Sequence, residues 1–172
     1  SAASDVYKRQ FQIWVNLPAK DKMMKPRYQD IPSSEIPETS DDEGTVWAKV
    51  IAGRALGVEA VIDTVIPITL IHVRLKPGAM YTQACETNHN VMLYAFGGSL
   101  KVAGRTLEDG GLGLLSPGDS VTMTAGKKGA ELLILGGPEL GEPIARYGPF
   151  VMNTRQEIYQ AVKDYNEGTF AA

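Results

Sequence analysis

The stretch PGAMYTQACETNHNVMLYAFGG, residues Pro77–Gly98, carries the clearest structural pattern in this chain. A Pro-Gly turn precedes a short run at Met80–Gln83, and an apolar, aromatic-rich run at Val91–Phe96 is closed by two glycines. A second stretch, GLGLLSPGDSVTMTAG (Gly111–Gly126), repeats this plan around a Pro-Gly-Asp turn. Short strands closed by Gly or by Pro-Gly-Asp are typical of hairpins. We therefore expect two hairpins within a small antiparallel barrel or sandwich.

The spacing within both stretches resembles the two motifs of the cupin superfamily, a small jelly-roll barrel. The first cupin motif is Gly, five residues, His-x-His, three or four residues, Glu, six residues and Gly, and it fits from Gly78 to Gly97. The second motif fits from Gly111 through its Pro-Gly-Asp turn. At the positions of the family's metal ligands this chain has Ala84, Glu86, Asn90 and Thr122. Since a metal site of this type needs about three imidazoles and a carboxylate, we expect a cupin jelly-roll barrel that holds no metal.

The polar side chains at these former ligand positions are Glu86, Asn90 and Thr122. We expect them to line a small vestigial pocket, and we expect no catalytic residue in the chain. Strand alternation predicts that Cys85 points away from the barrel interior that Glu86 faces. A metal site built from His72 and His89, helped by Glu86 or Cys85, is an alternative, although structural histidines are the commoner case.

Composition points to a soluble all-β domain. The chain has 172 residues, of which 44% are hydrophobic and 22% charged, and its 18 Gly and 10 Pro suit a fold rich in turns. A net charge of −3 gives no reason to expect a nucleic acid or an acidic membrane as a partner. No apolar run approaches the roughly 20 residues that cross a bilayer. The single Cys85 excludes an intrachain disulfide, and we expect a cytoplasmic location, or a nuclear one in a eukaryote.

The N-terminal third contains three segments that do not read as part of the barrel. Residues 1–10, SAASDVYKRQ, resemble the translated end of a transposon-type sequencing adapter, so we expect a library artefact attached to a fragment of a longer protein. Residues 11–18, FQIWVNLP, alternate in the manner of a strand. Residues 19–45 are polar and punctuated by proline, which predicts a linker.

The expected barrel domain covers residues 46–152, and a helix with a short tail covers residues 153–172. The barrel should open with a strand at Val46–Ala52, and further strands are expected within Thr64–Leu75 and Glu131–Leu135. Thr154 has the character of a helix N-cap, with Glu157 three residues later as its capping-box partner. The helix should continue to about Tyr165, with Ile158, Ala161, Val162 and Tyr165 as its apolar stripe.

Two segments carry a narrower resemblance, to the pirin family of the cupin superfamily. FQIWVNLPAKDKMMKPRYQ (Phe11–Gln29) resembles the junction where the N-terminal cupin of pirins passes into the linker. EPIARYGPFVMNTRQEIYQAVKDYNEGTF (Glu142–Phe170) resembles the pirin C-terminal signature, with its Gly-Pro-Phe-Val-Met-Asn-Thr run and following helix. Val50–Leu56 is similar to the start of the pirin C-terminal domain. Residues 11–18 would then be the last strand of a truncated N-terminal cupin.

The resemblance implies a bicupin whose iron is held in the N-terminal cupin, while the C-terminal cupin has lost its ligands. It implies a parent protein that is an iron-dependent, quercetin 2,3-dioxygenase-like oxidoreductase, and a fragment that is itself metal-free and non-catalytic. The implied partners are the protein's own N-terminal cupin, a flavonol-like small molecule bound by the parent, and a protein partner. The alternative is a non-enzymatic transcription co-regulator or protein-interaction cupin.

Overall fold

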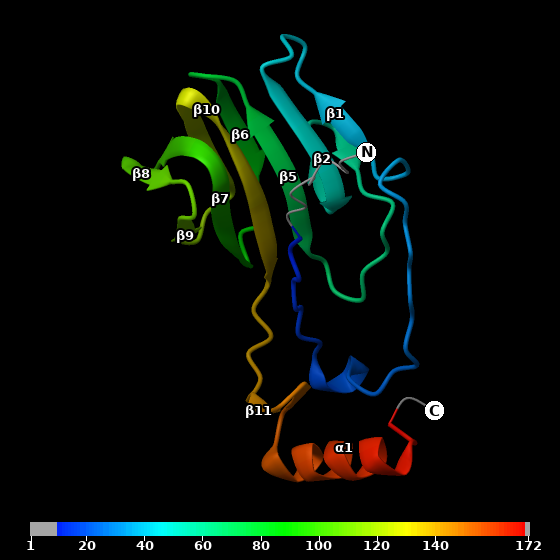
Figure 1. Cartoon of the computed structure of the whole chain (residues 1–172). Coiled ribbons are helices and arrows are strands. Elements are labelled where there is room, and N and C mark those ends of the chain that lie inside the picture. Colours follow the sequence, from blue (N-terminus) through cyan, green and yellow to red (C-terminus); the bar gives the residue numbers. More distant parts are fainter. Residues whose placement is uncertain (1–9, 171–172) are drawn as a thin grey trace, which may run out of the picture. The chain divides into compact units, whose positions relative to one another are not determined.

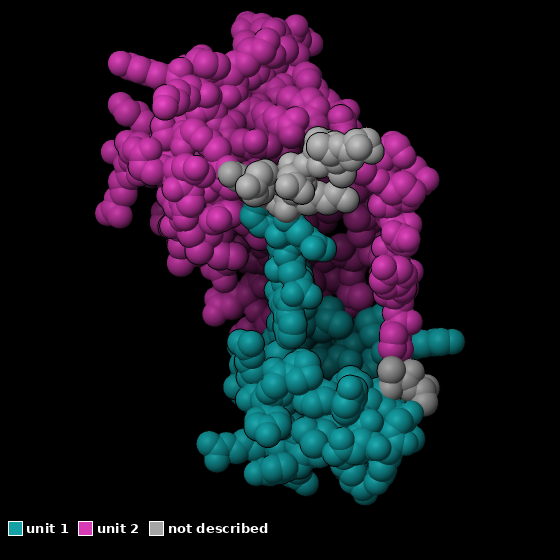
Figure 2. All heavy atoms as spheres, in the orientation of Figure 1, with its two compact units in different colours: residues 1–25, 142–172 teal, residues 26–141 magenta. Residues whose placement is uncertain are grey.

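A computed structural model describes residues 10–170, which form two compact units (Figure 2). The sheet unit comprises residues 26–141, and the helix unit comprises residues 10–25 together with residues 142–170. Residues 1–9, most of the segment expected to be an adapter artefact, lie outside the described residues. The boundaries differ from the expected barrel domain of residues 46–152, because residues 142–152 group with the terminal helix.

The sheet unit contains one eight-stranded antiparallel sheet and a small two-stranded hairpin. The sheet strands are β1 (Glu38–Ser40), β2 (Val46–Ala52), β5 (Thr69–Leu75), β6 (Met80–Ala84), β7 (His89–Val102), β8 (Arg105–Glu108), β9 (Leu112–Leu114) and β10 (Ser120–Pro138). The hairpin consists of β3 (Arg54–Ala55) and β4 (Val58–Glu59). Along its main path the sheet runs β1-β2-β5-β10-β7-β8, and β10 lies between β5 and β7 (Figure 1). Residues 10–170 are therefore mostly β-sheet, with one α-helix outside the sheet.

The long strands β7 and β10 hold this sheet together because each has more than one neighbour along an edge. The first part of β10, Ser120–Thr124, pairs with β6, and its later part, Ala130–Gly136, pairs with β5. On its other edge β10 pairs with β7, which in turn pairs with β8 and β9. The two expected hairpins are therefore wrong: β6 pairs with β10 rather than β7, and β9 pairs with β7 rather than β10. Long-range pairing of this kind is characteristic of jelly rolls, whose Greek-key connections place strands that are distant in sequence side by side.

The paired glycines of β7 do not end the strand, as the sequence suggested, but carry an irregularity within it. Gly98 has a φ of +68° and pairs with Ala130 across a register shift in β10. A Cβ on Gly98 would overlap the carbonyl group of Gly129, which has a φ of +82°. Only glycine combines positive φ with so close an approach of two backbones, so these positions mark a β-bulge in both strands.

The core lies on one face of the sheet, and strict alternation places it there. In β2 the residues Val46, Ala48, Val50 and Ala52 are buried, while those between them are partly exposed. Ile71, Leu93, Leu132 and Ile134 complete this layer from three further strands and are inaccessible to solvent. Full burial of each such side chain contributes about 1.5–3 kcal/mol. This apolar layer holds the strands on which the polar site is built.

The helix unit consists of a 3-10 turn, η1 (Ala19–Asp21), a hairpin of β11 (Ala145–Tyr147) and β12 (Phe150–Met152), and the helix α1 (Arg155–Glu167). Thr154 caps α1 as expected: its hydroxyl accepts from the Glu157 amide, and the Glu157 carboxylate accepts from the Thr154 amide. The helix runs two residues beyond the expected end and stops at Gly168, whose φ of +74° is typical of a C-cap. None of the helices described within residues 10–170 has the length and apolar character needed to cross a bilayer.

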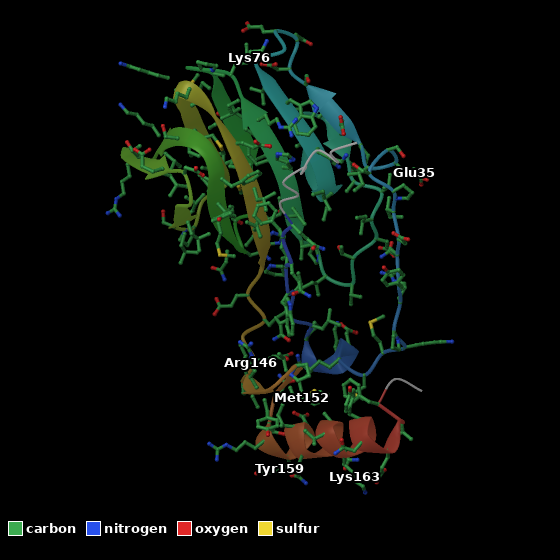
Figure 3. All side chains as sticks on the ribbon, viewed as in Figure 1. Glu35, Lys76, Arg146, Met152, Tyr159 and Lys163 are labelled. Atoms are coloured by element: carbon green, nitrogen blue, oxygen red, sulfur yellow. The ribbon has the colours of Figure 1, made fainter. Side chains whose placement is uncertain are left out.

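One side of α1 packs within the helix unit and the other is polar. Ile158 and Ala161 are buried as the apolar stripe predicted, whereas Tyr165 remains largely exposed. Tyr159 and Lys163 lie on the opposite side of the helix from β12 (Figure 3). The Phe150 ring makes edge contacts with the rings of Tyr165 and Phe170, at centroid distances of 5.8 and 5.2 Å. These rings anchor the end of α1 to its hairpin.

Two expectations for the N-terminal third differ from the structure. Residues 11–18 are not a β-strand in the structure, although their alternation predicted one. The expected linker, residues 19–45, contains η1 and also β1, which pairs with β2 in register Thr39 with Ala48. The proline and charged residues of this stretch predicted a linker, but both are also common in edge strands such as β1.

Candidate functional site

A cavity of 610 Å³ lies within the sheet unit where the β3–β4 hairpin faces β6. The apolar part of the lining, the apolar wall, comes from the hairpin and the segment that leads to β5, with Ala55, Leu56, Ala60, Ile62, Pro67 and Ile68; the same stretch also contributes Arg54, Glu59 and Thr69. A second part, the polar wall, comes from β6 and the turn after it, with Tyr81, Gln83, Cys85, Glu86 and His89. We call this space the barrel cavity. Its volume is within the range of small-molecule sites.

A buried hydrogen-bond cluster fixes the polar wall. The Tyr81 hydroxyl donates to the Gln83 side-chain oxygen, and both residues are only 5% exposed. The Gln83 amide nitrogen donates to the carbonyl oxygens of Arg54 and Ala84, at 3.0 and 2.8 Å. Burial raises the pKa of Tyr81 to about 12, so its hydroxyl stays protonated at neutral pH. Because both amide protons of Gln83 are used, its oxygen must face Tyr81, and the side chain cannot flip without losing these bonds.

His89 and Cys85 complete the polar wall with less constrained groups. His89 is 9% exposed, and its ring makes no hydrogen bond to any other described residue. The Cys85 thiol is half-buried, donates to the Gln83 carbonyl oxygen at 3.6 Å, and packs against the apolar core. Burial raises the pKa of this thiol, which keeps it protonated and unreactive. The imidazole of His89 is therefore a buried polar group in this wall that makes no hydrogen bond to another described residue.

The structure does not bring the expected site residues together. Glu86 lies at the rim of the barrel cavity, Thr122 lines a different hollow, and Asn90 is exposed on β7. Thr122 pairs instead with Thr82 on the outward side of the sheet, where their hydroxyl oxygens are 2.9 Å apart. The expected facing of Cys85 and Glu86 is also reversed, since Cys85 packs against the core and Glu86 is exposed.

These differences arise because the expected alternation of inward and outward side chains is shifted by one residue relative to the structure. In β6 the buried positions are Tyr81 and Gln83, so Ala84 lies on the outer face. Shifting a strand by one residue moves every side chain to the other face. The sequence contained a signal for the correct phase: Val121 and Met123 are apolar, so Thr122 between them must face outward. Gln83 and Tyr81 were missed because motif spacing was given more weight than this alternation.

The two histidines lie in different environments and form no common metal site. His72 is on the outer face of β5, where its Nε2 is 2.7 Å from a Glu131 carboxylate oxygen. The same oxygen accepts from Arg74 Nε at 2.9 Å, and the Arg74 guanidinium lies 4.7 Å from the Trp47 ring centre. Burial lowers the pKa of His72 and outweighs the opposing effect of Glu131. Among residues 10–170 no group of three or more His, Cys, Asp or Glu side chains is placed to hold a metal ion.

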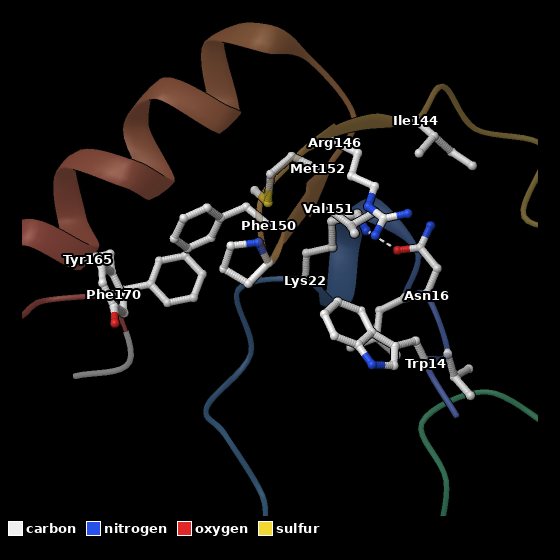
Figure 4. Close-up of a pocket in the computed structure, with 13 residues that line it drawn as sticks. Trp14, Asn16, Lys22, Ile144, Arg146, Phe150, Val151, Met152, Tyr165 and Phe170 are labelled. Carbon is white, nitrogen blue, oxygen red and sulfur yellow. Dashed lines mark hydrogen bonds between the residues drawn. The ribbon is translucent and has the colours of Figure 1, made fainter. Parts of the chain in front are cut away.

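A second hollow, of 660 Å³, lies within the helix unit between residues 14–22 and the β11–β12 hairpin (Figure 4). Its lining is mainly apolar and aromatic, with Trp14, Ile144, Phe150, Met152, Tyr165 and Phe170. Trp14 is 60% exposed and Ile144 70%. The polar groups at its edge are Arg146 and the pair formed by Lys22 Nζ and Asn16 Oδ1, 2.5 Å apart. Exposed aromatic and aliphatic groups gathered around a hollow are typical of interaction surfaces.

Comparison with known proteins is consistent with this geometry. Residues 70–171 match the pirin C-terminal cupin domain. The chain is 36% identical to human pirin over 159 residues, which are 90% of this chain and 54% of that protein. It is 35% identical to a pirin-like protein of Solanum lycopersicum over 164 residues, 91% of this chain and 55% of that protein.

A solved structure of quercetin 2,3-dioxygenase from Acinetobacter baumannii is similar with a TM-score of 0.84 and 34% identity. That match covers 92% of this chain and 56% of the solved chain. The chain therefore spans just over half the length of the relatives it matches. The family match begins within β5 and continues through β10 and the complete helix α1. The cupin fold expected from the two glycine-rich stretches is confirmed. This chain belongs to the pirin family, and its matched region is the pirin C-terminal cupin domain.

Proposed function

We propose that this chain is the metal-free C-terminal cupin of a pirin-like bicupin, and that the whole protein is an iron-dependent, quercetin 2,3-dioxygenase-like enzyme. The similarity to a solved quercetin 2,3-dioxygenase supports the reaction class. The extra length of the relatives supports a second domain. A cytoplasmic location, or a nuclear one in a eukaryote, belongs to the same proposal.

The metal-ligating side chains of this chain are the observation that places the proposed iron site in the other cupin rather than in this one. Iron in cupins needs several imidazoles and a carboxylate at one point, and the described residues offer no such group. His72 faces Glu131 on the outer side of the sheet, while His89 lines the barrel cavity. Since these residues do not fit the metal, we assign no step of oxygen chemistry to them. The proposed iron site lies in the other cupin.

In this proposal the helix unit packs against the N-terminal cupin of the same protein. The exposed lining of its hollow, notably Trp14 and Ile144, supplies the apolar area that a stable domain interface buries (Figure 4). Arg146 and the Lys22–Asn16 pair would form a polar rim around that apolar centre. Covering this surface would also bury part of residues 14–17, which line the hollow.

The same surface favours a second candidate function, a non-enzymatic co-regulator that binds a protein partner. A large exposed aromatic side chain such as Trp14 in the lining of an apolar hollow is a common anchor in protein interfaces. The two candidates differ in chemistry rather than in surface. An enzyme must turn over a flavonol with its iron, whereas a regulator needs only a stable fold and a binding face.

The test has two parts. First, this chain is purified with ferrous iron under reducing conditions, and its metal content is measured; we expect far less than one iron per chain, and tight one-to-one binding would contradict the proposal. Second, the coding sequence on both sides of this chain is determined, and the longer protein is assayed for iron and for quercetin turnover. One bound iron with turnover is expected. Iron without turnover would favour the regulator, and an extended protein without either would refute the enzyme.

A further inference from the structure

We propose that the barrel cavity binds a neutral small molecule that carries a ring and at least one hydroxyl group, independently of any iron chemistry elsewhere in the protein. This site differs from the one that motif spacing suggested. It depends on Tyr81, Gln83 and His89, and neither Asn90 nor Thr122 lines it. Three observations support the proposal. The cavity is lined by both apolar and polar side chains, its polar side chains have hydrogen-bonding groups that the protein does not use, and its rim has a net negative charge.

The mixed lining defines the character of the ligand. The hairpin and the segment before β5 contribute the aliphatic side chains of Leu56, Ile62 and Ile68. The strand β6 and the turn after it contribute the Tyr81–Gln83 pair and His89. A bound molecule therefore needs both an apolar surface and a polar edge. A single ring with a polar substituent has this form, and a volume of 610 Å³ accommodates it.

The polar wall has hydrogen-bonding capacity that the protein does not use. Gln83 donates both amide protons to the Arg54 and Ala84 carbonyl groups, but its oxygen accepts only from Tyr81 and can accept once more. The Tyr81 oxygen donates its proton and can also accept one. The His89 ring has no described partner and offers one donor and one acceptor. The wall thus presents more acceptors than donors, and a ligand hydroxyl would supply the missing proton.

The charges at the rim argue against an anion. Arg54 and Glu59 are both exposed and form an ion pair with each other, so their charges offset. Glu86 is exposed at the rim with no ion-pair partner among the described residues, and it leaves a net negative charge there. A carboxylate or phosphate entering the cavity would pass this charge, and the Arg54 guanidinium in the lining is already paired with Glu59. A neutral alcohol or phenol is not repelled by the negative rim and needs no cation in the cavity.

The cavity is also preformed, which lowers the cost of binding. Gln83 bridges β6 to the β3–β4 hairpin through the Arg54 carbonyl, and that hairpin forms the apolar wall. The Ala60 amide donates to the Gly53 carbonyl at 2.9 Å and closes the hairpin at its base. Because both walls are tied to the sheet, a ligand would not need to order them first.

The test is a titration of the ¹⁵N-labelled chain with 4-methoxyphenol, with 1,4-dimethoxybenzene as the matched probe that lacks a hydroxyl donor and with benzoate as the anion. We expect saturable chemical-shift changes confined to residues 53–69 and 81–89 for the phenol, with a Kd in the millimolar range that suits so small a ligand. The dimethyl ether and benzoate should bind at least fivefold more weakly. Equal binding of phenol and ether would overturn the recognition of a hydroxyl, and tighter binding of benzoate would overturn the charge argument.

Two variants and a control separate binding from folding. Ala60→Phe fills the cavity from its apolar wall without removing a hydrogen bond, and it should weaken phenol binding at least tenfold while the spectrum stays folded. Gln83→Leu removes the acceptor and should weaken binding similarly where the chain remains folded. Asn90→Thr lies on the exposed side of β7 and should leave the Kd unchanged. Unchanged affinity in Ala60→Phe, or shift changes elsewhere in the chain, would overturn the site.

Discussion

Gly98 offers the sharpest test of how the two long strands are joined. It lies within β7 with a φ of +68°, and a Cβ at this position would overlap the backbone carbonyl group of Gly129 on β10. Holding an L-residue in the left-handed region costs roughly 1–2 kcal/mol. Forcing packed backbones apart costs roughly 1–3 kcal/mol more. We therefore expect Gly98→Ala to lower the free energy of unfolding by about 2–5 kcal/mol.

Gly104 is the matched control because it isolates the conformational part of that cost. It has a φ of +73°, close to that of Gly98, but a Cβ there would meet no atom within 4 Å. Gly104→Ala should therefore cost only about 1–2 kcal/mol. The difference between the two variants, roughly 1–3 kcal/mol, measures the close approach of β7 to β10.

The assay is equilibrium unfolding in urea, followed by tryptophan fluorescence in a Trp14→Phe background so that Trp47 reports on the sheet unit alone. With a slope of about 2 kcal/mol per molar, Gly98→Ala should move the midpoint down by about 1–2.5 M, and Gly104→Ala by 1 M or less, with about the same slope. Equal midpoints for the two variants would refute the reasoning. They would mean that the strands separate at this point without cost.

Two further predictions concern α1 and the outer face of the sheet. Thr154→Ala removes the cap hydroxyl and should destabilise α1 by about 1 kcal/mol, seen as faster amide exchange in its first turn, whereas Thr154→Ser should behave like the parent; equal exchange in both variants would contradict this role. Burial lowers the pKa of His72 below its ordinary value of 6.5, so unfolding takes up a proton below that pH and stability should fall as pH decreases from 6.5. His72→Phe should flatten the dependence of the unfolding free energy between pH 6.5 and 5, and an unchanged slope would show that His72 does not contribute.

Local sequence signals predicted the elements that depend on neighbouring residues. Apolar alternation placed β2 at Val46–Ala52 with its observed bounds, and the Thr154–Glu157 pair located the start of α1. Both signals act within four or five residues, so no distant partner is needed to interpret them. The family resemblance also rested on short sequence motifs, and the match to the pirin C-terminal cupin domain confirms it.

The polar site could not be predicted in the same way. Motif spacing selected Glu86, Asn90 and Thr122, but burial is decided by which face of each strand meets the core. The phase of β6 is set by its pairing with β10, in which Tyr81 lies opposite Met123. Those residues are more than 40 positions apart in the sequence, so the spacing within either motif does not reveal the register.

From the amino-acid order alone came the all-β class, the capped helix and the pirin resemblance, because each depends on short-range sequence patterns. Strand partners, the bulge at Gly98, the cluster of Tyr81 and Gln83, and the barrel cavity required the folded chain. Their physical origin is long-range pairing: β10 joins β5, β6 and β7, and only that arrangement determines which side chains turn inward.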